Sequence, residues 1–283
     1  MQPNKILSQE NNPIIRVLLY HRILSDTSDK DAANIGVSEV SFRKQIEWLD
    51  QWGYTAITFT DYSLFLEGIL DLPKKPVIIT FDDTYKDMYE YGFPILKKYG
   101  MKAVIFVVVD KSITTSVWDE GIGEVFALLG QPEILEMNAA GFEVGSHTIT
   151  HPRLTVMSLE TAREELEQSR ISLEILLNAP VKSFAYPFGL VNNQVKELVK
   201  ESGYSFACAS YSGPPIFTDD LFEIRRIKVS NTSVRFLFWL QLQQIHIYYR
   251  WLRWAISRRL FGFLKKDKIS EYDKKIMQQT KGK

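Results

Sequence analysis

Short apolar runs that alternate with helical patterns restrict the fold of this chain more than any other feature of its sequence. The runs are rich in Val and Ile, and "KAVIFVVV" (102–109) is apolar after its first residue, as expected for a strand that is covered on both faces. Helical segments separate the runs, for example "SEVSFRKQIEWLDQWG" (38–53), in which Phe42, Ile46 and Leu49 share one face. This alternation favours a mainly parallel sheet.

The alternation continues along most of the chain. Strands are predicted at 14–20, 54–59, 76–81, 102–109, 142–146, 181–187, 205–209 and 223–229, and helices at 38–53, 61–69, 84–100, 132–141, 158–177 and 193–203. The pattern predicts an α/β protein, with a barrel as the first interpretation and a doubly wound sheet as the second.

Composition and targeting signals narrow the class of protein. The 283 residues are 45% hydrophobic and 24% charged, which is typical of a globular protein, and the one cysteine, Cys208, excludes an internal disulfide framework. Residues 1–13 lack the basic-then-apolar pattern of a signal peptide, and no run of about 18 residues is apolar and free of charge. We therefore expect a cytoplasmic protein without a transmembrane span.

Charge divides the chain into a body and a tail. Residues 235–283 contain 12 Lys or Arg and 3 Asp or Glu, whereas residues 1–234 contain 22 and 31, so that the net charges are +9 and −9. We expect residues 1–234 to form the main domain and residues 235–283 to form a basic, aromatic, helical tail.

The tail pattern indicates a surface-seeking helix. On helical spacing, residues 235–266 carry an apolar band made of Leu237, Leu240, Ile247, Trp251, Trp254 and Phe261. A basic amphipathic helix rich in Trp predicts an in-plane contact with the inner face of a membrane. The alternative is a helix that packs on the barrel or in a dimer interface. Nucleic-acid binding is disfavoured, because no readout motif accompanies the charge.

Polar side chains follow several predicted strands, where catalytic groups gather in parallel α/β proteins. His21 follows strand 14–20, Asp82 and Asp83 follow strand 76–81, and His147 follows strand 142–146 with His151 four residues on. The chain has four histidines, and three are in this set. Histidine is the commonest metal ligand and titrates near neutral pH. The set therefore predicts a metal or proton-transfer site.

Two histidines and one carboxylate form the usual ligand set of a catalytic zinc ion with one open position. "SHTITHP" (146–152) places His147 and His151 at i and i+4, and one member of the Asp82–Asp83 pair can complete the set. The other aspartate is then available as a base for the attacking water. The alternatives are surface or capping histidines and an acidic pair that caps helix 84–100.

Three motifs of the chain resemble those of the polysaccharide deacetylases, the NodB-homology group or carbohydrate esterase family 4. They are "TFDD" (80–83), "SHTITHP" (146–152) and "FAYPFG" (184–189), and the resemblance covers residues 14–230. It implies a distorted (β/α) barrel of about seven units. It also implies a divalent metal, most commonly Zn2+, and hydrolytic removal of acetyl groups from an N-acetylated carbohydrate.

The resemblance also implies a role for individual residues. Asp82 corresponds to the catalytic base, and Asp83, His147 and His151 correspond to the metal ligands. The backbone N–H of Phe188 falls where the family places an oxyanion donor.

Two departures point to the poly-N-acetylglucosamine deacetylase branch of the family. Lys182 stands where many members have an arginine that orients the base, and Arg226 in "RRIKV" resembles the arginine of this branch. The late Leu-x-His motif of the general acid is missing. "LLYHRIL" (18–24) instead matches the Y-H-x-I stretch of the branch, so His21 is the expected general acid.

Other activities stay open at this stage. An acetyl ester or a non-sugar amide would suit the same site, and a carbohydrate-binding scaffold with a dead site is a further alternative. A glycosidase is disfavoured, because adjacent aspartates do not give two opposed carboxylates. Trp118 and Asp119 lie in a loop that can border the cleft, and Asp119 can pair with His21, but a loop anchor explains them equally well.

Overall fold

The computed structural model describes residues 13–25, 31, 34–120, 124–210 and 212–261, with the side chains of 258–261 left out. The strands are β1 (Arg16–Tyr20), β2 (Arg22–Leu24), β3 (Gly36–Ser38), β4 (Thr55–Ala56), β5 (Pro76–Phe81), β6 (Val104–Val107), β7 (Glu143–Ser146), β8 (Ser183–Ala185), β9 (Phe206–Cys208) and β10 (Ile227–Lys228). The α-helices are α1 (Glu39–Gln51), α2 (Phe59–Leu66), α3 (Phe93–Lys98), α4 (Gln131–Ala139), α5 (Leu159–Leu177), α6 (Asn193–Glu201), α7 (Arg235–Gln241) and α8 (Gln244–Phe261).

The main sheet is parallel throughout and curls around a central axis. Its strand order is β10-β1-β5-β6-β7-β8-β9, with β4 paired to β5. Ile224 forms a parallel bridge with Cys208 of β9, and three residues later β10 pairs with β1. The segment 224–228 therefore links the last strand to the first, and the expected distorted barrel is confirmed, whereas the doubly wound alternative is wrong.

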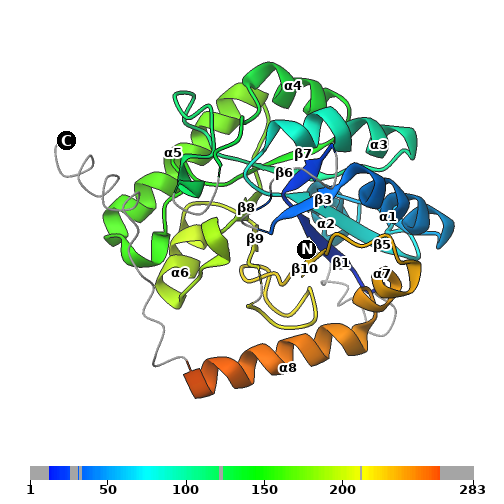
Figure 1. Ribbon diagram of the computed structural model, residues 1–283. Helices are drawn as coiled ribbons and strands as arrows, with labels where there is room; N and C mark the ends of the chain where they lie inside the picture. Colours follow the sequence, from blue (N-terminus) through cyan, green and yellow to red (C-terminus); the bar gives the residue numbers. More distant parts are fainter. Residues whose placement is uncertain (1–12, 26–30, 32–33, 121–123, 211, 262–283) are drawn as a thin grey trace.

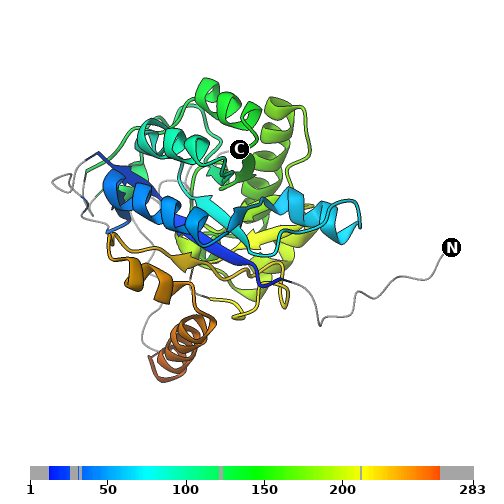
Figure 2. The same ribbon diagram turned by 90° about the vertical axis from the view of Figure 1, so that its right-hand side faces the viewer.

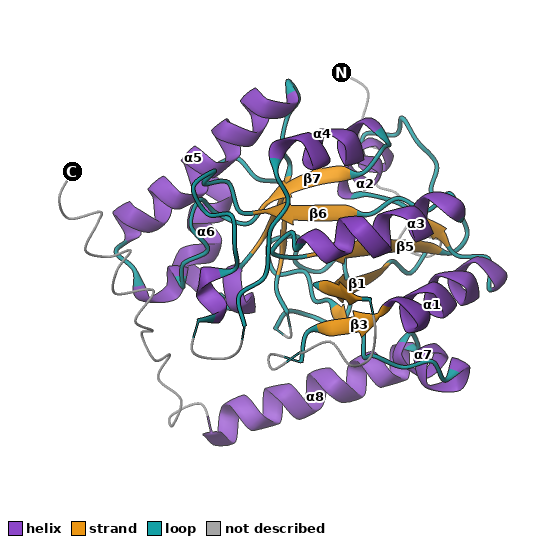
Figure 3. Cartoon of the chain, turned by 45° about the horizontal axis from the view of Figure 1, so that its top comes forward, coloured by secondary structure: helices purple, strands orange, loops and turns teal. Residues whose placement is uncertain are grey.

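Helices cover the outside of the curled sheet. Figure 1 shows α1, α3, α4, α5 and α6 arranged around the strands, and Figure 3 shows the parallel strands with helices on both sides. α2 instead contributes to the barrel interior, because Phe59 stacks on Phe206 at 5.4 Å and Tyr62 contacts Phe217 edge-on at 4.9 Å. Aromatic side chains thus fill the interior below the end where the strands terminate.

The alternation of side chains along β5 places polar groups inside the barrel. Val77, Ile79 and Phe81 belong to the core cluster between sheet and helices, whereas Ile78 belongs to the interior cluster. Successive strand residues point to opposite faces, so Asp82 continues the inner set after Ile78 and the buried Thr80. The strand therefore delivers a carboxylate to the inner end of the barrel.

Local hydrogen bonds set the helix boundaries. Thr58 and Asp61 form a capping box in which each side chain accepts from the other's backbone N–H, so α2 begins at Phe59. The predicted strand 54–59 is therefore too long, and only Thr55–Ala56 pairs with β5.

The predicted helix 84–100 is interrupted. A π-helix, Met88–Gly92, precedes α3, and Pro94 lies in the first turn of α3. Proline has no N–H to donate and fits poorly in a helix interior, so the first turn is the position that tolerates it.

The beginning of the tail packs on the barrel. Phe238 of α7 is fully buried, with its ring 6.1 Å from Trp48 and 6.0 Å from Trp52 of the α1 end. Arg16 Nε donates to the carbonyl of Leu242 at 2.6 Å. α8 then lies along the outside of the barrel (Figures 1 and 2). The division of the chain at residue 234 stays a prediction, but α7 shares the core of the body.

None of the helices among the described residues is both long enough and apolar enough to cross a membrane.

Truncation of the buried ring of α7 is expected to destabilise the whole body. We expect Phe238→Ala to lower the free energy of unfolding by about 3–5 kcal/mol, because a fully buried ring is lost from a packed site. Phe236→Ala, two residues away and 63% exposed, is the matched control and should change it by less than about 0.5 kcal/mol. Urea unfolding followed by circular dichroism measures both, and equal effects would show that α7 is not part of the core.

Candidate metal centre and active site

The polar residues that follow the strands meet at one end of the barrel. His21 comes directly after β1, Asp82 after β5 and His147 after β7. The Asp82 N–H donates to Tyr20 O at 3.1 Å and the His147 N–H to Val107 O at 2.8 Å, so each continues its strand pairing by one residue. A cavity of about 230 Å3 opens there, lined by Leu19, His21, Ile35, Asp82, Asp83, Trp118, Asp119, His147, His151, Phe188, Gly189, Ser210 and Lys228.

Three potential metal ligands converge within this cavity. The Nε2 atoms of His147 and His151 each lie 3.1 Å from Oδ1 of Asp83. All three side chains are buried, and their ligand atoms lie within 4.8 Å of one another. Two imidazole nitrogens and one carboxylate oxygen are the donor set that the sequence predicted.

The chemistry of these three groups fits a cation. His147 Nδ1 lies 2.7 Å from the carbonyl of Ala185, to which it donates, so the neutral ring presents an Nε2 lone pair to the Asp83 carboxylate. Lone pairs that face one another in a buried site repel unless a proton or a metal ion lies among them. Nitrogen and oxygen ligands suit a divalent ion such as Zn2+. The outer N–H of His147 is anchored, whereas Nδ1 of His151 has no hydrogen-bond partner among the described residues.

The electrostatics of the three groups agree with this conclusion. Burial raises the pKa of Asp83, but the neighbouring His151 and His147 outweigh it and hold the pKa well below its usual range. Burial lowers the pKa of His147, yet the hydrogen bond that its protonated ring donates to Asp83 and the charge of Asp82 leave the pKa raised. The carboxylate is therefore ionised. Burial outweighs the charge of Asp83 at His151 and lowers the pKa of His151, so this imidazole is available as a neutral ligand.

Unusual backbone conformations concentrate at this centre. Seven described non-glycine residues have positive φ. Three of them line the cavity, namely Asp83 (67°), His151 (58°) and Phe188 (58°), and two more, Thr84 (55°) and Thr148 (72°), directly follow lining residues in the chain. The left-handed region is costly for side chains with a Cβ, and most costly for β-branched threonine. Backbone strain of this kind persists where surrounding contacts enforce it, and it clusters at functional sites.

Glu165 of α5 supplies contacts that enforce the loop between the two histidines. Its carboxylate accepts from the N–H of Ile149 at 2.8 Å, from the N–H of Thr150 at 3.0 Å and from the hydroxyl of Thr150 at 2.7 Å. Thr148 Oγ1 accepts from the N–H of His151 at 2.9 Å. The sequence analysis missed Glu165, although its position on the buried face of helix 158–177 was a usable signal.

Asp82 is held by a buried arginine. Arg226 Nη1 and Nη2 donate to the two carboxylate oxygens of Asp82, each at 2.6 Å, and Arg226 Nε donates to Ala209 O at 3.1 Å. Burial raises the pKa of Asp82, but the Arg226 guanidinium outweighs it and leaves the pKa below its ordinary value. Asp82 is thus an oriented, ionised carboxylate beside the metal ligands.

Lys182 does not share this role. Its ammonium donates to Ser63 Oγ of α2 at 2.9 Å and lies 3.6 Å from a Glu67 carboxylate oxygen. Lys182 directly precedes β8, so it lies at the end of the strand opposite the cavity. The bidentate geometry at Asp82 requires a planar fork, which only arginine offers.

Aromatic rings border the His151 side of the cavity. The ring of Trp118 lies 4.2 Å from that of His151, and the ring of Phe188 lies 4.6 Å from it. Arg153 in turn covers the Phe188 ring at 3.7 Å. These rings limit the access of water to one metal ligand and fix its orientation.

His21 and Asp119 both line the cavity, but the described residues show no hydrogen bond between them. Asp119 instead accepts from the Tyr85 hydroxyl at 2.8 Å, which favours the loop-anchor interpretation of this residue. Burial lowers the pKa of His21, whereas the charges of Asp83 and Asp82 raise it, and the net shift is downward. The role of His21 as a general acid stays a prediction.

The turn after β8 brings Phe188 against the cavity. Gly189 has a φ of 66°, and a Cβ at this position would lie 2.2 Å from Ser210 Oγ, so only glycine fits. Ser210 and Lys228, which the sequence analysis did not select, also line the cavity. The oxyanion role of the Phe188 N–H stays a prediction.

The fold and the site together are those of a metal-dependent hydrolase of the barrel type. An Asp-His-His centre lies at the carboxyl ends of the parallel strands, and a second aspartate, held by an arginine, lies beside it. A family profile described as polysaccharide deacetylase matches residues 70–207. The poly-beta-1,6-N-acetyl-D-glucosamine N-deacetylase of Staphylococcus aureus is 28% identical over 256 residues, which cover 83% of this chain and 84% of the relative.

Solved structures of deacetylases are also similar to this chain. The deacetylase PplD of Streptococcus pyogenes, in complex with acetate, has a TM-score of 0.69 and 26% identity, covering 82% of this chain and 100% of that one. BC0361, a polysaccharide deacetylase from Bacillus cereus, has a TM-score of 0.66 and 28% identity, covering 81% and 69%. Residues 70–207 thus carry a polysaccharide deacetylase domain, and the relatives and solved structures that the chain is similar to are deacetylases.

Removal of one histidine ligand is expected to abolish metal binding. We expect His147→Ala, after incubation with zinc and desalting, to retain less than about one tenth of the zinc of the unsubstituted protein, because the chelating set loses a ligand. His246→Ala, on α8, is the control and should retain all of it. Elemental analysis measures the zinc content, and equal content in the two variants would contradict the assignment.

Proposed function

We propose that this chain is a metal-dependent hydrolase that removes N-acetyl groups from an amino-sugar polymer, oligosaccharide or lipid-linked glycan. The observation that carries the proposal is the division of labour between two adjacent aspartates. Asp83 lies with His147 and His151, whereas Asp82 is ionised and held by Arg226 in the same cavity. The activity named for the Staphylococcus aureus relative supports the choice of substrate.

The metal would be held by Asp83, His147 and His151. Bound there, a divalent ion such as Zn2+ supplies a Lewis acid that lowers the pKa of water to about 7 and polarises a carbonyl. Asp82 takes a proton from the attacking water, and Arg226 keeps its carboxylate ionised and oriented for that transfer. Because Asp82 is already charged and fixed, little reorganisation accompanies the transfer.

Two further residues act on the later steps in this proposal. The Phe188 N–H donates to the oxygen that becomes negative when water adds to the acetamide carbonyl. His21 gives a proton to the departing amine nitrogen, and it lines the cavity together with Asp82 and Asp83. Collapse of the tetrahedral intermediate then breaks the C–N bond and releases acetate and a free amino sugar.

The size of the cavity bears on the substrate. About 230 Å3 is less than the roughly 300–1,000 Å3 typical of pockets that enclose a whole small molecule. The cavity therefore holds the acetamido group while the rest of the sugar lies outside, which suits a long or tethered glycan. A hydrolase of acetyl esters or non-sugar amides is the alternative, and the substrates compared below distinguish the two.

Substitution of the proposed base is expected to separate chemistry from metal binding. We expect Asp82→Asn to lower the rate of acetate release from N-acetylated chitooligosaccharides by about 10²–10⁴-fold, because an amide cannot accept the proton. Its zinc content should equal that of the unsubstituted protein. Asp50→Asn, exposed on α1, is the matched control.

Three outcomes of this experiment are informative. Full activity of Asp82→Asn would contradict the assignment of the base. Loss of zinc from this variant would contradict the division of roles between Asp82 and Asp83. Faster acetate release from O-acetylated xylan than from chitooligosaccharides would favour the ester hydrolase.

We also propose that residues 235–266 contact a membrane surface. Within the described part of this segment, α8 exposes five apolar or aromatic side chains, each 42–77% exposed: Ile245, Tyr248, Tyr249, Leu252 and Ile256. Their spacing of three and four residues places them on one helix face. Residues 235–266 contain no Asp or Glu, so the charge near this face favours anionic lipids.

The exposed face differs from the band that the sequence predicted. Ile247, Trp251 and Trp254 are partly buried, and Ile247 packs against the core cluster of the barrel. The helix is apolar on both of these faces, and only packing against the barrel decides which one is free. Phe261 belongs to the part of α8 whose side chains are not described, and residues 262–266 lie outside the described residues.

A charge on the exposed face is expected to weaken vesicle binding. We expect Ile245→Glu to lower co-sedimentation with phosphatidylglycerol vesicles by at least about fivefold, because a carboxylate replaces a side chain that enters the interface. Ile69→Glu, 68% exposed in the loop after α2, is the matched control and should bind as before. Equal binding of the two variants, or no vesicle binding by the unsubstituted protein, would contradict the proposal.

A further inference from the structure

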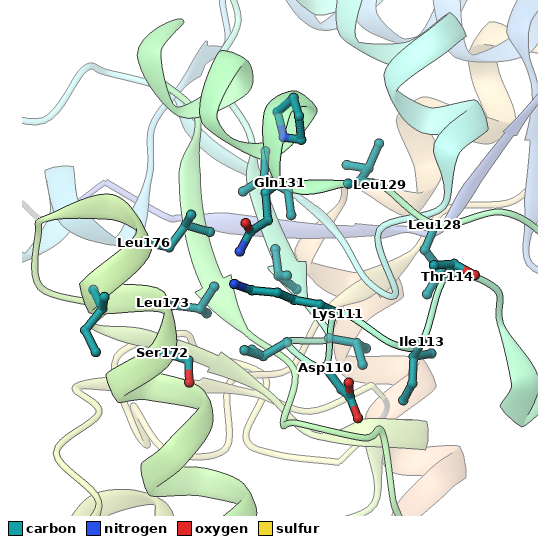
Figure 4. Close-up of a pocket in the computed structure, with 17 residues that line it drawn as sticks. Asp110, Lys111, Ile113, Thr114, Leu128, Leu129, Gln131, Ser172, Leu173 and Leu176 are labelled. Carbon is teal, nitrogen blue, oxygen red and sulfur yellow. The ribbon is translucent and has the colours of Figure 1, made fainter.

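A second cavity, larger than the active-site cavity, lies between α5 and the loops that flank β6 and α4 (Figure 4). Its volume is about 600 Å3, which is within the range of small-molecule sites. Most of its lining is aliphatic and comes from three parts of the chain: Val107, Val108, Val109, Ile113, Leu128, Leu129, Ile134, Leu173, Ile175 and Leu176. It shares no lining residue with the active-site cavity.

Two polar side chains enter this apolar cavity from different walls. Figure 4 shows the Lys111 side chain extending toward Leu173 and Leu176, with the Gln131 amide directed toward its ammonium group. Within the ranges that the structure describes, neither Lys111 nor Gln131 has a hydrogen-bond or ion-pair partner. Lys111 is exposed and Gln131 is partly buried, so a solvent-accessible positive charge and an amide line an aliphatic space, and neither pairs with a carboxylate of the described residues.

The nearby carboxylates are engaged elsewhere. Asp110 accepts from the N–H and the hydroxyl of Ser112, at 2.8 and 2.7 Å, and Figure 4 shows its carboxylate turned away from the Lys111 ammonium. Glu174 on α5 pairs with Arg170 at 2.7 Å, and Glu133 on α4 lies 3.9 Å from the ammonium of Lys86. The charge that the cavity lacks is therefore negative.

We propose that this cavity binds an anionic amphiphile with a single acyl chain, of the fatty-acid type. The aliphatic walls take the chain, which gains the free energy of apolar burial. Lys111 pairs with the carboxylate, and the Gln131 amide donates to it. An uncharged apolar ligand would make no use of the Lys111 charge, and a small inorganic anion would leave the aliphatic walls empty.

The position of the cavity connects it to the metal centre. Two of its lining residues donate backbone hydrogen bonds to the loop between the histidines. Val109 N–H donates to Thr148 O at 3.2 Å, and Asp110 N–H donates to Ile149 O at 3.0 Å. A third lining residue, Leu129, donates its N–H to the carbonyl of Thr84, next to Asp83, at 2.9 Å. A bound chain thus supports both of the strained segments that carry metal ligands, and it stabilises the folded protein by mass action.

Binding of dodecanoate, below its critical micelle concentration, tests the proposal with the full chain. Isothermal titration calorimetry should show one saturable site, and dodecanoate should raise the thermal midpoint. Lys111→Gln should weaken binding by about tenfold, because one charge-assisted contact is lost. Leu176→Trp should abolish binding by filling the space. If Leu176→Trp does not fold, Ser172→Phe takes its place. Ser172 is an exposed lining residue on α5, so a phenylalanine there should also fill the cavity and abolish binding.

Two control variants separate this site from other sources of amphiphile binding. Lys74→Gln removes an exposed lysine in the loop before β5 and should bind dodecanoate normally. Ile245→Glu alters the exposed face of α8 and should also bind normally. Absence of saturable binding would overturn the proposal. Binding that survives Lys111→Gln and the filling variant, or that is lost in Ile245→Glu, would overturn it as well. None of these outcomes depends on deacetylase activity.

Discussion

A carboxylate oxygen of Asp83 and the Nε2 atoms of His147 and His151 face one another inside the barrel, and this arrangement needs a positive charge among them. The rest of the site follows from that need. His147 is oriented by the Ala185 carbonyl, and the His151 segment is tied to α5 through Glu165. These contacts offset the left-handed backbone at Asp83 and His151, which costs of order 1–3 kcal/mol per residue. The left-handed backbone lowers the local stability of these segments, and in return it fixes the geometry of the ligands.

The two adjacent aspartates acquire different roles through backbone geometry. Neighbouring residues of a strand point to opposite faces, so Asp82 faces the interior and Asp83 would face the helices. The strand ends at Phe81, and the positive φ of Asp83 turns its side chain back into the same cavity. Arg226 then binds both oxygens of Asp82, which leaves Asp83 to the histidines. Repulsion between the neighbours is offset by a separate positive partner for each.

The tail and the second cavity provide two further candidate binding surfaces outside the barrel opening. α7 is anchored by Phe238, and α8 follows with one face against the protein and another exposed. The second cavity lies behind the segments that carry Asp83 and His151, and its lining residues donate backbone hydrogen bonds to both segments. The proposed glycan, lipid-surface and acyl-chain contacts therefore involve different parts of one body. Each can be perturbed by a substitution that leaves the other two intact.

The sequence by itself determined the elements and the chemical composition of the site. The alternation of apolar runs and helical patterns predicted the parallel barrel, and His147, His151 and the Asp82–Asp83 pair were visible because polar residues at strand ends stand out against apolar neighbours. Local patterns could not show that Glu165 secures the histidine loop, that Lys182 pairs with α2 or that Arg226 reaches Asp82 across 144 positions. They also could not show that Ile247, Trp251 and Trp254 of the apolar band are partly buried, whereas another face of α8 is exposed. These features depend on contacts between residues far apart in the chain, and only the closed barrel, which fixes the register of every strand against its neighbours, decides which side chains meet.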